Sequence, residues 1–243
     1  QEKGLSYYDI AKTLAKEAGG KVECYAQEKK VKNLLLQYRE TDWEFLKRLA
    51  SHSNSVLIAD PKGKNPKFTF GAEKKEEYKD EVDSGENFAV RKKVSRYRKI
   101  SPDEELGYKE KDAVEYTLQT DHAAFETGDM VKRNGKALYV KEADIHLKGS
   151  VFTCHYRLVT KKGLSVKKAS HPYASGLTLE GTVLKPEGDT VKVCLAIDGK
   201  QDEDKAYPFP YATGYSAEQH TGWYVMPEKG DTVQIIFPSE DEN

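Results

Sequence analysis

Adjacent Cys154 and His155 are the first residues whose types suggest chemistry, because a thiol beside an imidazole can form a nucleophile and its base. They lie in the segment VFTCHYRLV, which alternates apolar and polar residues as a half-buried strand does. Neighbours in a strand point to opposite faces. We therefore expect Cys154 on the apolar face with Tyr156 and Leu158. His155 is expected on the other face with Arg157, so the pattern predicts a core cysteine and a surface histidine.

The remaining candidates for metal binding or catalysis lack the spacing that such sites need. The other histidines show neither H-x-x-x-H nor H-x-x-E-H spacing, and the three cysteines are too far apart for a zinc motif. There is no P-loop, GxGxxG, GxSxG or HExxH motif. The acidic run at 73–83 is typical of a solvated loop. The sequence thus predicts no catalytic residue, no metal and no cofactor. The histidines that lack metal-binding spacing are His52, His122, His146, His171 and His220.

The segment VRKKVSRYRK at 90–99 is the densest basic cluster. Two interpretations stay open for it. The cluster can contact phosphates, or it can be the solvent-facing side of a strand and its continuation, balanced by nearby acids. The chain has 39 basic and 40 acidic residues, a net charge of −1, which favours the second interpretation. The basic residues are Arg91, Lys92, Lys93, Arg96, Arg98 and Lys99.

A short motif occurs twice, as KPEGDTVKVCL at 185–195 and as MPEKGDTVQIIF at 226–237. Proline fixes φ for a turn, glycine permits a left-handed corner, and aspartate can bond the backbone that follows it. The Thr-Val pair then begins a run of strand-forming residues. We therefore interpret Asp189 and Asp231 as turn residues at the start of strands rather than as catalysts.

The first sixty residues have helical patterns. In SYYDIAKTLAKEAGG, Ser6 can cap a helix that the two glycines end, and Ile10, Leu14 and Ala18 mark its buried stripe. A T-x-x-E capping box, Thr41 with Glu44, begins a second helix in TDWEFLKRLASHSNS, with an apolar stripe behind it. The segments VECYA, SVLIAD and KFTFGA are expected to be strands.

From residue 88 to 164 the period changes to two, which predicts an antiparallel meander. Asn134-Gly135 is a favoured two-residue hairpin turn, and Lys148-Gly149 is expected to form the next turn. Five short strands follow within 177–243, as in a small barrel of the OB type. The chain is 37% apolar and 33% charged, which predicts thin cores built from sheets.

These patterns predict a mainly β, α+β fold with an N-terminal helical segment, a tube-like antiparallel β domain and a small OB-type barrel. The expected divisions are 1–60, 61–165, a linker at 166–176, and 177–243. No stretch approaches the ~18 apolar residues of a membrane helix. The sequence begins with Gln1 and no signal segment, and a piece of a longer chain would look the same.

The segment QYRETDWEFLKRLASHSNSVLIAD at 37–60 resembles the signature of the late control protein D / VgrG family, the hub proteins of contractile phage tails and related injection systems. The segment from Gly128 to Val159 resembles the second tube-like domain of that family, and the last seventy residues resemble its OB domain. The matching signature residues are Tyr38, Arg39, Glu40, Thr41, Asp42, Trp43, Phe45, Leu46, Arg48, Leu49 and Ala50, and those of the last hairpin are Pro227, Gly230, Asp231 and Val233.

This resemblance implies a structural, non-enzymatic baseplate hub that joins a tail tube to a piercing spike and forms a homotrimer. The implied partners are the tube, baseplate and spike proteins, with transient passage of DNA or effector cargo. Synthesis in the cytoplasm and assembly into a virion tail or injection particle are implied as well. The basic run would line the lumen or face a neighbouring chain.

The chain also differs from the pattern of that family. The first tube-like barrel and the β-helical spike of the family are not recognisable, so we expect a fragment or a shortened member. The alternative function is a nucleic-acid-binding OB module with an appended β domain.

Overall fold

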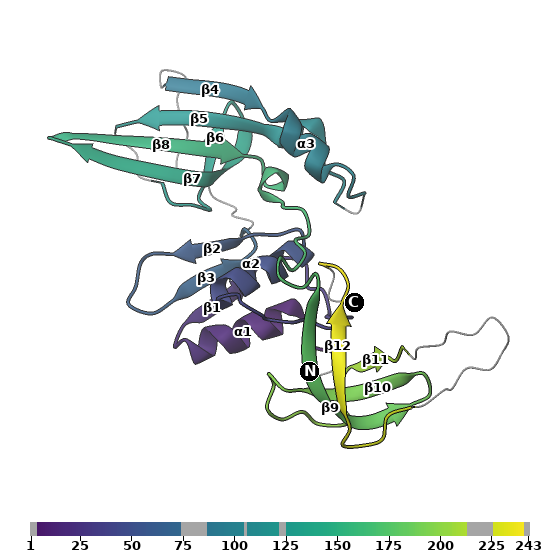
Figure 1. The fold of residues 1–243 in the computed structure, drawn as a ribbon. Coiled ribbons are helices and arrows are strands. Elements are labelled where there is room, and N and C mark those ends of the chain that lie inside the picture. The colour runs from purple at the N-terminus through teal and green to yellow at the C-terminus, as the bar shows by residue number, and fades with distance from the viewer. Residues whose placement is uncertain (1–3, 74–86, 105, 122–124, 213–225, 241–243) are drawn as a thin grey trace. The chain divides into compact units, whose positions relative to one another are not determined.

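The computed structural model describes residues 4–73, 87–104, 106–121, 125–212 and 226–240 (Figure 1). The fold is mostly β, with helices near the N-terminus and largely antiparallel sheets, which confirms the predicted α+β class. None of the described helices has the length and apolar character needed to cross a bilayer. The acidic run at 73–83 lies outside the described residues except for Glu73.

The chain forms two compact units that do not follow its order. Unit 1 comprises Gln1–Ser6, Lys30–Glu40 and Ser170–Asn243, and unit 2 comprises Tyr7–Lys29 and Thr41–Ala169. Residues 30–40, which lie early in the sequence, thus belong with the C-terminal third of the chain. The predicted divisions at 60, 165 and 176 stay predictions.

Unit 2 begins with a three-stranded sheet and two helices. The sheet has the order β1-β3-β2, with β1 parallel and β2 antiparallel to β3. Ala59 and Phe68 are cross-strand partners that line one groove with side chains of both helices. The elements are α1 (Tyr7–Glu17), β1 (Lys21–Cys24), α2 (Asp42–His52), β2 (Leu57–Asp60) and β3 (Lys67–Phe70).

Both helices end in the same hydrogen-bonded motif, in which a left-handed residue lets two amides reach back to the last turn. After α1 that residue is Gly19, with φ of 69°, and the amide of Gly20 donates to the carbonyl of Ala15 at 2.7 Å. After α2 it is Asn54, with φ of 50°, and the amide of Ser55 donates to a carbonyl of the last turn. The two glycines therefore end α1 as predicted.

The buried residues of α1 differ from the predicted stripe. Ala11 and Ala15 are buried, whereas Ile10 and Leu14 are half-buried and Ala18 is exposed. The stripe is therefore rotated by one position, because the helix packs its small residues closest to its neighbours. A four-residue spacing fits either row, so the sequence could not select between them.

The second part of unit 2 is a five-stranded antiparallel sheet of order β4-β5-β8-β7-β6. Asn134 and Gly135 form the β6–β7 turn with φ of 46° and 73°, as predicted for a two-residue hairpin. The β7–β8 turn lies at Gly149 and Ser150, one residue later than predicted. The elements are β4 (Asn87–Lys92), α3 (Val94–Ile100), the 3-10 helix η1 (Glu110–Ala113), β5 (Val114–Thr120), β6 (Met130–Arg133), β7 (Lys136–Lys148), β8 (Val151–Val159) and the 3-10 helix η2 (Lys162–Leu164).

One face of this sheet is a packed core. Cys154, Tyr156 and Leu158 of β8 are fully buried there with apolar residues of β5, β6 and β7. The hydroxyl of Tyr156 accepts a hydrogen bond from the amide of Phe125 at 2.9 Å, so the polar end of this buried ring is satisfied. Ile58 of β2 packs into an adjoining cluster, which joins the two sheets of unit 2.

Unit 1 contains a four-stranded antiparallel sheet of order β11-β10-β9-β12. Leu34 and Leu36, from the early segment, are buried in its core. Strands β10 and β12 begin at the threonines of the two repeated motifs, Thr190 and Thr232, as predicted. The fourth of the five predicted strands, GWYVM, lies outside the described residues except for Met226. The strands are β9 (Leu177–Glu187), β10 (Thr190–Leu195), β11 (Pro208–Pro210) and β12 (Thr232–Phe237).

Gly20 lies so close to the β2–β3 connection that a side chain does not fit. A Cβ atom built on Gly20 would stand 2.2 Å from the carbonyl oxygen of Pro66. We expect Gly20→Ala to lower the free energy of unfolding by about 1–3 kcal/mol, because the backbone must shift to relieve the overlap. Urea denaturation measures this change. Lys12→Ala, on the exposed side of α1, is the control and should change stability by less than about 0.5 kcal/mol; equal stabilities would contradict the close approach.

Candidate functional site

The adjacent cysteine and histidine do not form a dyad. Cys154 is completely buried in the core, whereas His155 pairs with Asp144 across the β7–β8 ladder and lies on the opposite face of β8. This is the arrangement that the alternation predicted. Within the described ranges, no group of three or more His, Cys, Asp or Glu side chains is placed to hold a metal ion. His122 and His220 lie outside those ranges.

The signature residues of α2 act in capping and packing. The hydroxyl of Thr41 accepts from the amide of Glu44 at 3.3 Å, and the Glu44 carboxylate accepts from the amide of Thr41 at 2.9 Å, which confirms the capping box. Arg48 is buried, with its guanidinium 5.2 Å from the ring centre of Phe45. Trp43 stays 38% exposed and meets a phenylalanine of β3 edge-on. Asp42 is exposed, and the residues that fill the core are Phe45, Leu46, Leu49 and Ala50.

The signature residues before α2 belong to unit 1. Tyr38 packs against the core of that unit, and the guanidinium of Arg39 lies 5.4 Å from its ring centre. Arg39 has a left-handed backbone with φ of 53°. The carboxylate of Glu40 lies 3.8 Å from Nε2 of His171, and both side chains are almost completely buried. The signature therefore spans the boundary between the units, which falls between Glu40 and Thr41.

No sequence pattern predicts that Glu40 and His171 lie close together. Nδ1 of His171 accepts a hydrogen bond from the amide of Tyr173 at 3.1 Å, which assigns the proton of the neutral ring to Nε2, the atom that faces Glu40. The two residues lie far apart in the chain, and neither has a local motif around it. Only the fold of unit 1 brings them together.

The last hairpin motif builds a turn, in which the exposed Asp231 carboxylate bonds the backbone. Oδ2 of Asp231 accepts a hydrogen bond from the amide of Glu228 at 2.8 Å, which confirms its interpretation as a turn residue. Gly230 has φ of 97°, a conformation that favours glycine. Pro227 is buried, and Val233 packs against the core of unit 1.

The basic run divides between two elements. Strand β4 ends at Lys92, and α3 begins at Val94, so the prediction of a continuing strand was wrong after Lys92. The guanidinium of Arg96 donates to the carbonyls of Gly163 and Ser165 at 2.8 and 3.0 Å, which makes it a structural residue. Arg91, Lys92 and Arg98 are exposed, whereas Lys93 and Lys99 line a pocket.

This pocket, which we call the basic pocket, has a volume of about 510 Å³. It lies on the charged face of the five-stranded sheet, opposite the core, beside α3 and the segment after η2. Six cationic side chains line it together with one carboxylate. These charged residues are Lys93, Arg96, Lys99, Lys141, Arg157, Lys167 and Glu115.

A bulge in β7 aims Lys141 into the basic pocket. The β7–β8 register shifts between Val140 and Glu142, so Lys141 is an extra residue without a partner on β8. Such a bulge redirects side chains. Nζ of Lys141 donates to Glu115 at 2.7 Å, and Nζ of Lys93 lies 3.5 Å from the other oxygen of Glu115.

Two opposing effects act on the buried Glu115 carboxyl. Burial raises its pKa, but the hydrogen bond and charge of Lys141, with the charges of Lys93 and Arg96, outweigh burial and lower it. Glu115 is therefore ionised at neutral pH and neutralises part of the surrounding positive charge. The bulge at Lys141 and the helix α3, which surround Glu115, were not predictable from the sequence.

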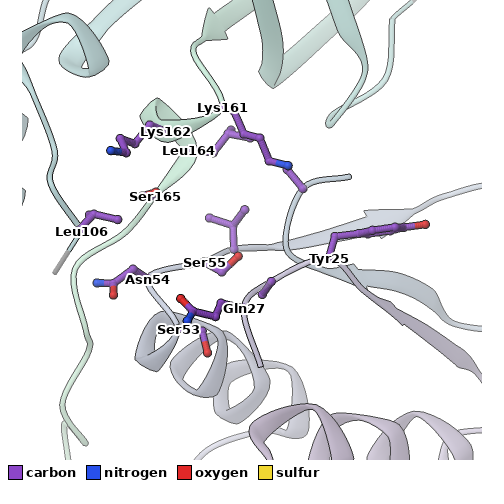
Figure 2. A pocket seen from close by; sticks show the side chains of 13 residues that line it. Tyr25, Gln27, Ser53, Asn54, Ser55, Leu106, Lys161, Lys162, Leu164 and Ser165 are labelled. Carbon is purple, nitrogen blue, oxygen red and sulfur yellow. The ribbon is translucent and has the colours of Figure 1, made fainter. Parts of the chain in front are cut away.

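A second pocket in unit 2, of about 400 Å³, lies between the end of α2 and the segment after β8 (Figure 2). In Figure 2 Lys161 and Lys162 lie on one side of the pocket, and Ser53, Asn54 and Ser55, which follow α2, lie on the other. Asn54 donates to Asp103 at 2.8 Å and so ties two loops together. The hydrogen bond from the Tyr25 hydroxyl to Glu23 raises the pKa of Tyr25 to about 12, so this phenol stays protonated.

The lining of this second pocket suits hydrogen bonding but not catalysis. The described residues that line it present hydroxyl, amide and amino groups, and none of them carries a carboxylate, imidazole or thiol. A general acid or base titrating near neutral pH is therefore absent from its lining.

Comparison with solved structures identifies a related fold. The E. coli c3393 protein, described as a type VI secretion system component with structural similarity to the T4 bacteriophage tail proteins gp27 and gp5, superposes with a TM-score of 0.62. The match covers 98% of this chain and 70% of that one, at 13% identity. This chain therefore shares the fold of that protein.

A tail protein from Neisseria meningitidis MC58 is similar over 67% of this chain and 68% of its own, at 14% identity and a TM-score of 0.49. No protein-family model and no curated protein sequence matches the chain.

Glu115 should make stability depend on acid pH. Its folded-state pKa lies below the ordinary value of 4.5, so its contribution is complete above that value and is lost as the pH falls through the lowered pKa. We expect Glu115→Gln to be less stable than the wild type at neutral pH, with a difference that shrinks below pH 4.5. Urea midpoints across this range measure the effect.

Glu104→Gln, at an exposed position, is the matched control, and its stability should change with pH as that of the wild type does. If the difference in stability between Glu115→Gln and the wild type stayed the same at every acid pH, that result would contradict an ionised, paired carboxylate.

Proposed function

We propose that this chain is a structural component of a contractile tail or a tail-like injection apparatus. The observation that carries the proposal is the fold similarity to the E. coli c3393 protein, which extends over 98% of the chain. The signature in residues 37–60 supports it independently, because that resemblance comes from the sequence alone.

Within such an apparatus we assign the chain to the hub that joins the tube to the spike. In this assignment the five-stranded sheet is the tube-like domain and the sheet of unit 1 belongs to an OB-type barrel. The chain assembles as a homotrimer of the late control protein D / VgrG type, with tube, baseplate and spike proteins as partners. Its place is a virion tail or an injection particle, where DNA or effectors pass.

The end of the β7–β8 hairpin supports a role in assembly. Strand β5 pairs with β8 only from Cys154 to Leu158, so the hairpin continues beyond β5 as a two-stranded ribbon (Figure 1). Leu147 is 72% exposed there and lies opposite Phe152, on the face that forms the core farther along. Apolar clusters of this kind mark protein–protein contacts. We infer that this apolar tip contacts a neighbouring subunit. It comprises Ile145, Leu147, Val151 and Phe152.

A non-enzymatic role is part of the proposal. The cysteine of the Cys154-His155 pair is in the core, and the second pocket has no carboxylate, imidazole or thiol in its lining. The carboxylate of the basic pocket is ionised and held by two lysines, which suits an ion pair better than proton transfer.

Deletion of the gene in the strain that produces the protein tests the tail assignment. We expect electron microscopy to show no complete contractile particles, and a plasmid copy to restore them. Normal particles in the deletion strain would overturn the proposal.

Light scattering tests the inferred subunit contact. We expect the natural full-length protein to be a trimer. Leu147→Asp combined with Phe152→Ser should raise the protein concentration at which half of the chains are assembled at least about tenfold, because a charge then replaces apolar contact area.

Ile197→Ser is the matched control, since Ile197 is 50% exposed and lies in unit 1. Circular dichroism checks that the variants fold. A full-length protein that stays monomeric, or an equal loss in both variants, would contradict the contact.

A further inference from the structure

The basic pocket carries more positive charge than its own carboxylate neutralises. The carboxylate of Glu115 forms ion pairs with Lys93 and Lys141, and Arg157 forms one with Glu142 at 3.0 Å. Six cations thus line the pocket against a single acidic side chain of its lining. The excess charge requires counter-ions when the pocket faces water.

Lys99 and Lys167 contribute two of these positive charges. Both side chains are exposed at the pocket, and neither forms an ion pair or side-chain hydrogen bond with the part of the chain that the structure describes. They come from different elements, α3 and the segment after η2, and meet at one concave surface. Charges gathered in a concavity concentrate the field and attract anions more strongly than the same charges on a flat surface.

We propose that the basic pocket binds an acidic segment of a partner protein, through its Asp and Glu side chains. Two lysines of the pocket already hold a carboxylate, Glu115, at 2.7 and 3.5 Å, which shows that their spacing suits this group. The guanidinium of Arg157 pairs with Glu142 through Nη1 and has further N–H donors beside the pocket. The volume of about 510 Å³ accommodates a few side chains rather than a folded domain.

Nucleic acid fits the pocket less well. Proteins that hold single strands stack bases on aromatic rings, and none of the described residues that line the pocket is aromatic. The chain as a whole has a net charge of −1, so it lacks the general excess of positive charge that favours phosphate backbones. The positive charge is local, and a short acidic segment matches its extent.

Fluorescence polarisation with a labelled glutamate-rich peptide tests the proposal on the whole chain. We expect saturable binding that weakens with salt. Lys99→Glu combined with Lys167→Glu should weaken binding at least about tenfold, because two attractive charges become repulsive. Glu115→Gln should instead strengthen binding, since it releases Lys93 and Lys141 for the peptide.

The matched control is Lys12→Glu combined with Lys64→Glu, which makes the same change in net charge at two exposed positions outside the pocket. This control should bind like the wild type, and melting curves should show that all variants fold. Three results would overturn the proposal. They are no binding by the wild type, an equal loss in the pocket and control variants, and tighter binding of a labelled oligothymidylate with the same dependence on Lys99 and Lys167.

Discussion

The pairing of β8 with both β5 and β7 is the constraint on which the largest part of the structure depends. This central strand presents Cys154, Tyr156 and Leu158 to the core on one face. On the other face it presents Arg157 to the basic pocket. A shift of one residue in its register would exchange these faces, placing charge in the core and apolar groups in water. Burial on one side therefore fixes the charged surface on the other.

The same strand links the core to the surface proposed for assembly. Where β5 ends, β7 and β8 continue as a pair, and the apolar face of the core extends into Leu147 and Phe152 without a covering element in the described chain. Two-stranded ribbons are marginal by themselves in water. A contact with another subunit would both cover these side chains and stabilise the ribbon, so stability and assembly would be coupled at this tip.

Unit 1 depends on a segment that lies far from its strands in the sequence. Leu34 and Leu36 complete its core, and Glu40 meets His171 in the interior. A buried carboxylate is costly unless a polar or charged partner compensates it. Glu40 faces the imidazole of His171 inside unit 1 at 3.8 Å, so this residue belongs to unit 1 rather than to the helix that follows.

The sequence by itself determined the elements whose signals are local. The capping box of Thr41 and Glu44, the Asn134-Gly135 turn and the alternation of β8 each depend on backbone preferences within a few residues, and the structure confirms all three. The turn role of Asp231 is confirmed in the same way, by a hydrogen bond to an amide three residues before it.

Only the tertiary structure decided which distant residues meet. The bulge at Lys141 depends on how β7 fits β8, and the start of α3 within the basic run depends on packing that no local pattern encodes. The pairing of Glu40 with His171 and the division into interleaved units depend on contacts between distant segments. Such contacts gain their free energy from burial, which is a property of the whole fold, so residue types and spacing cannot specify them.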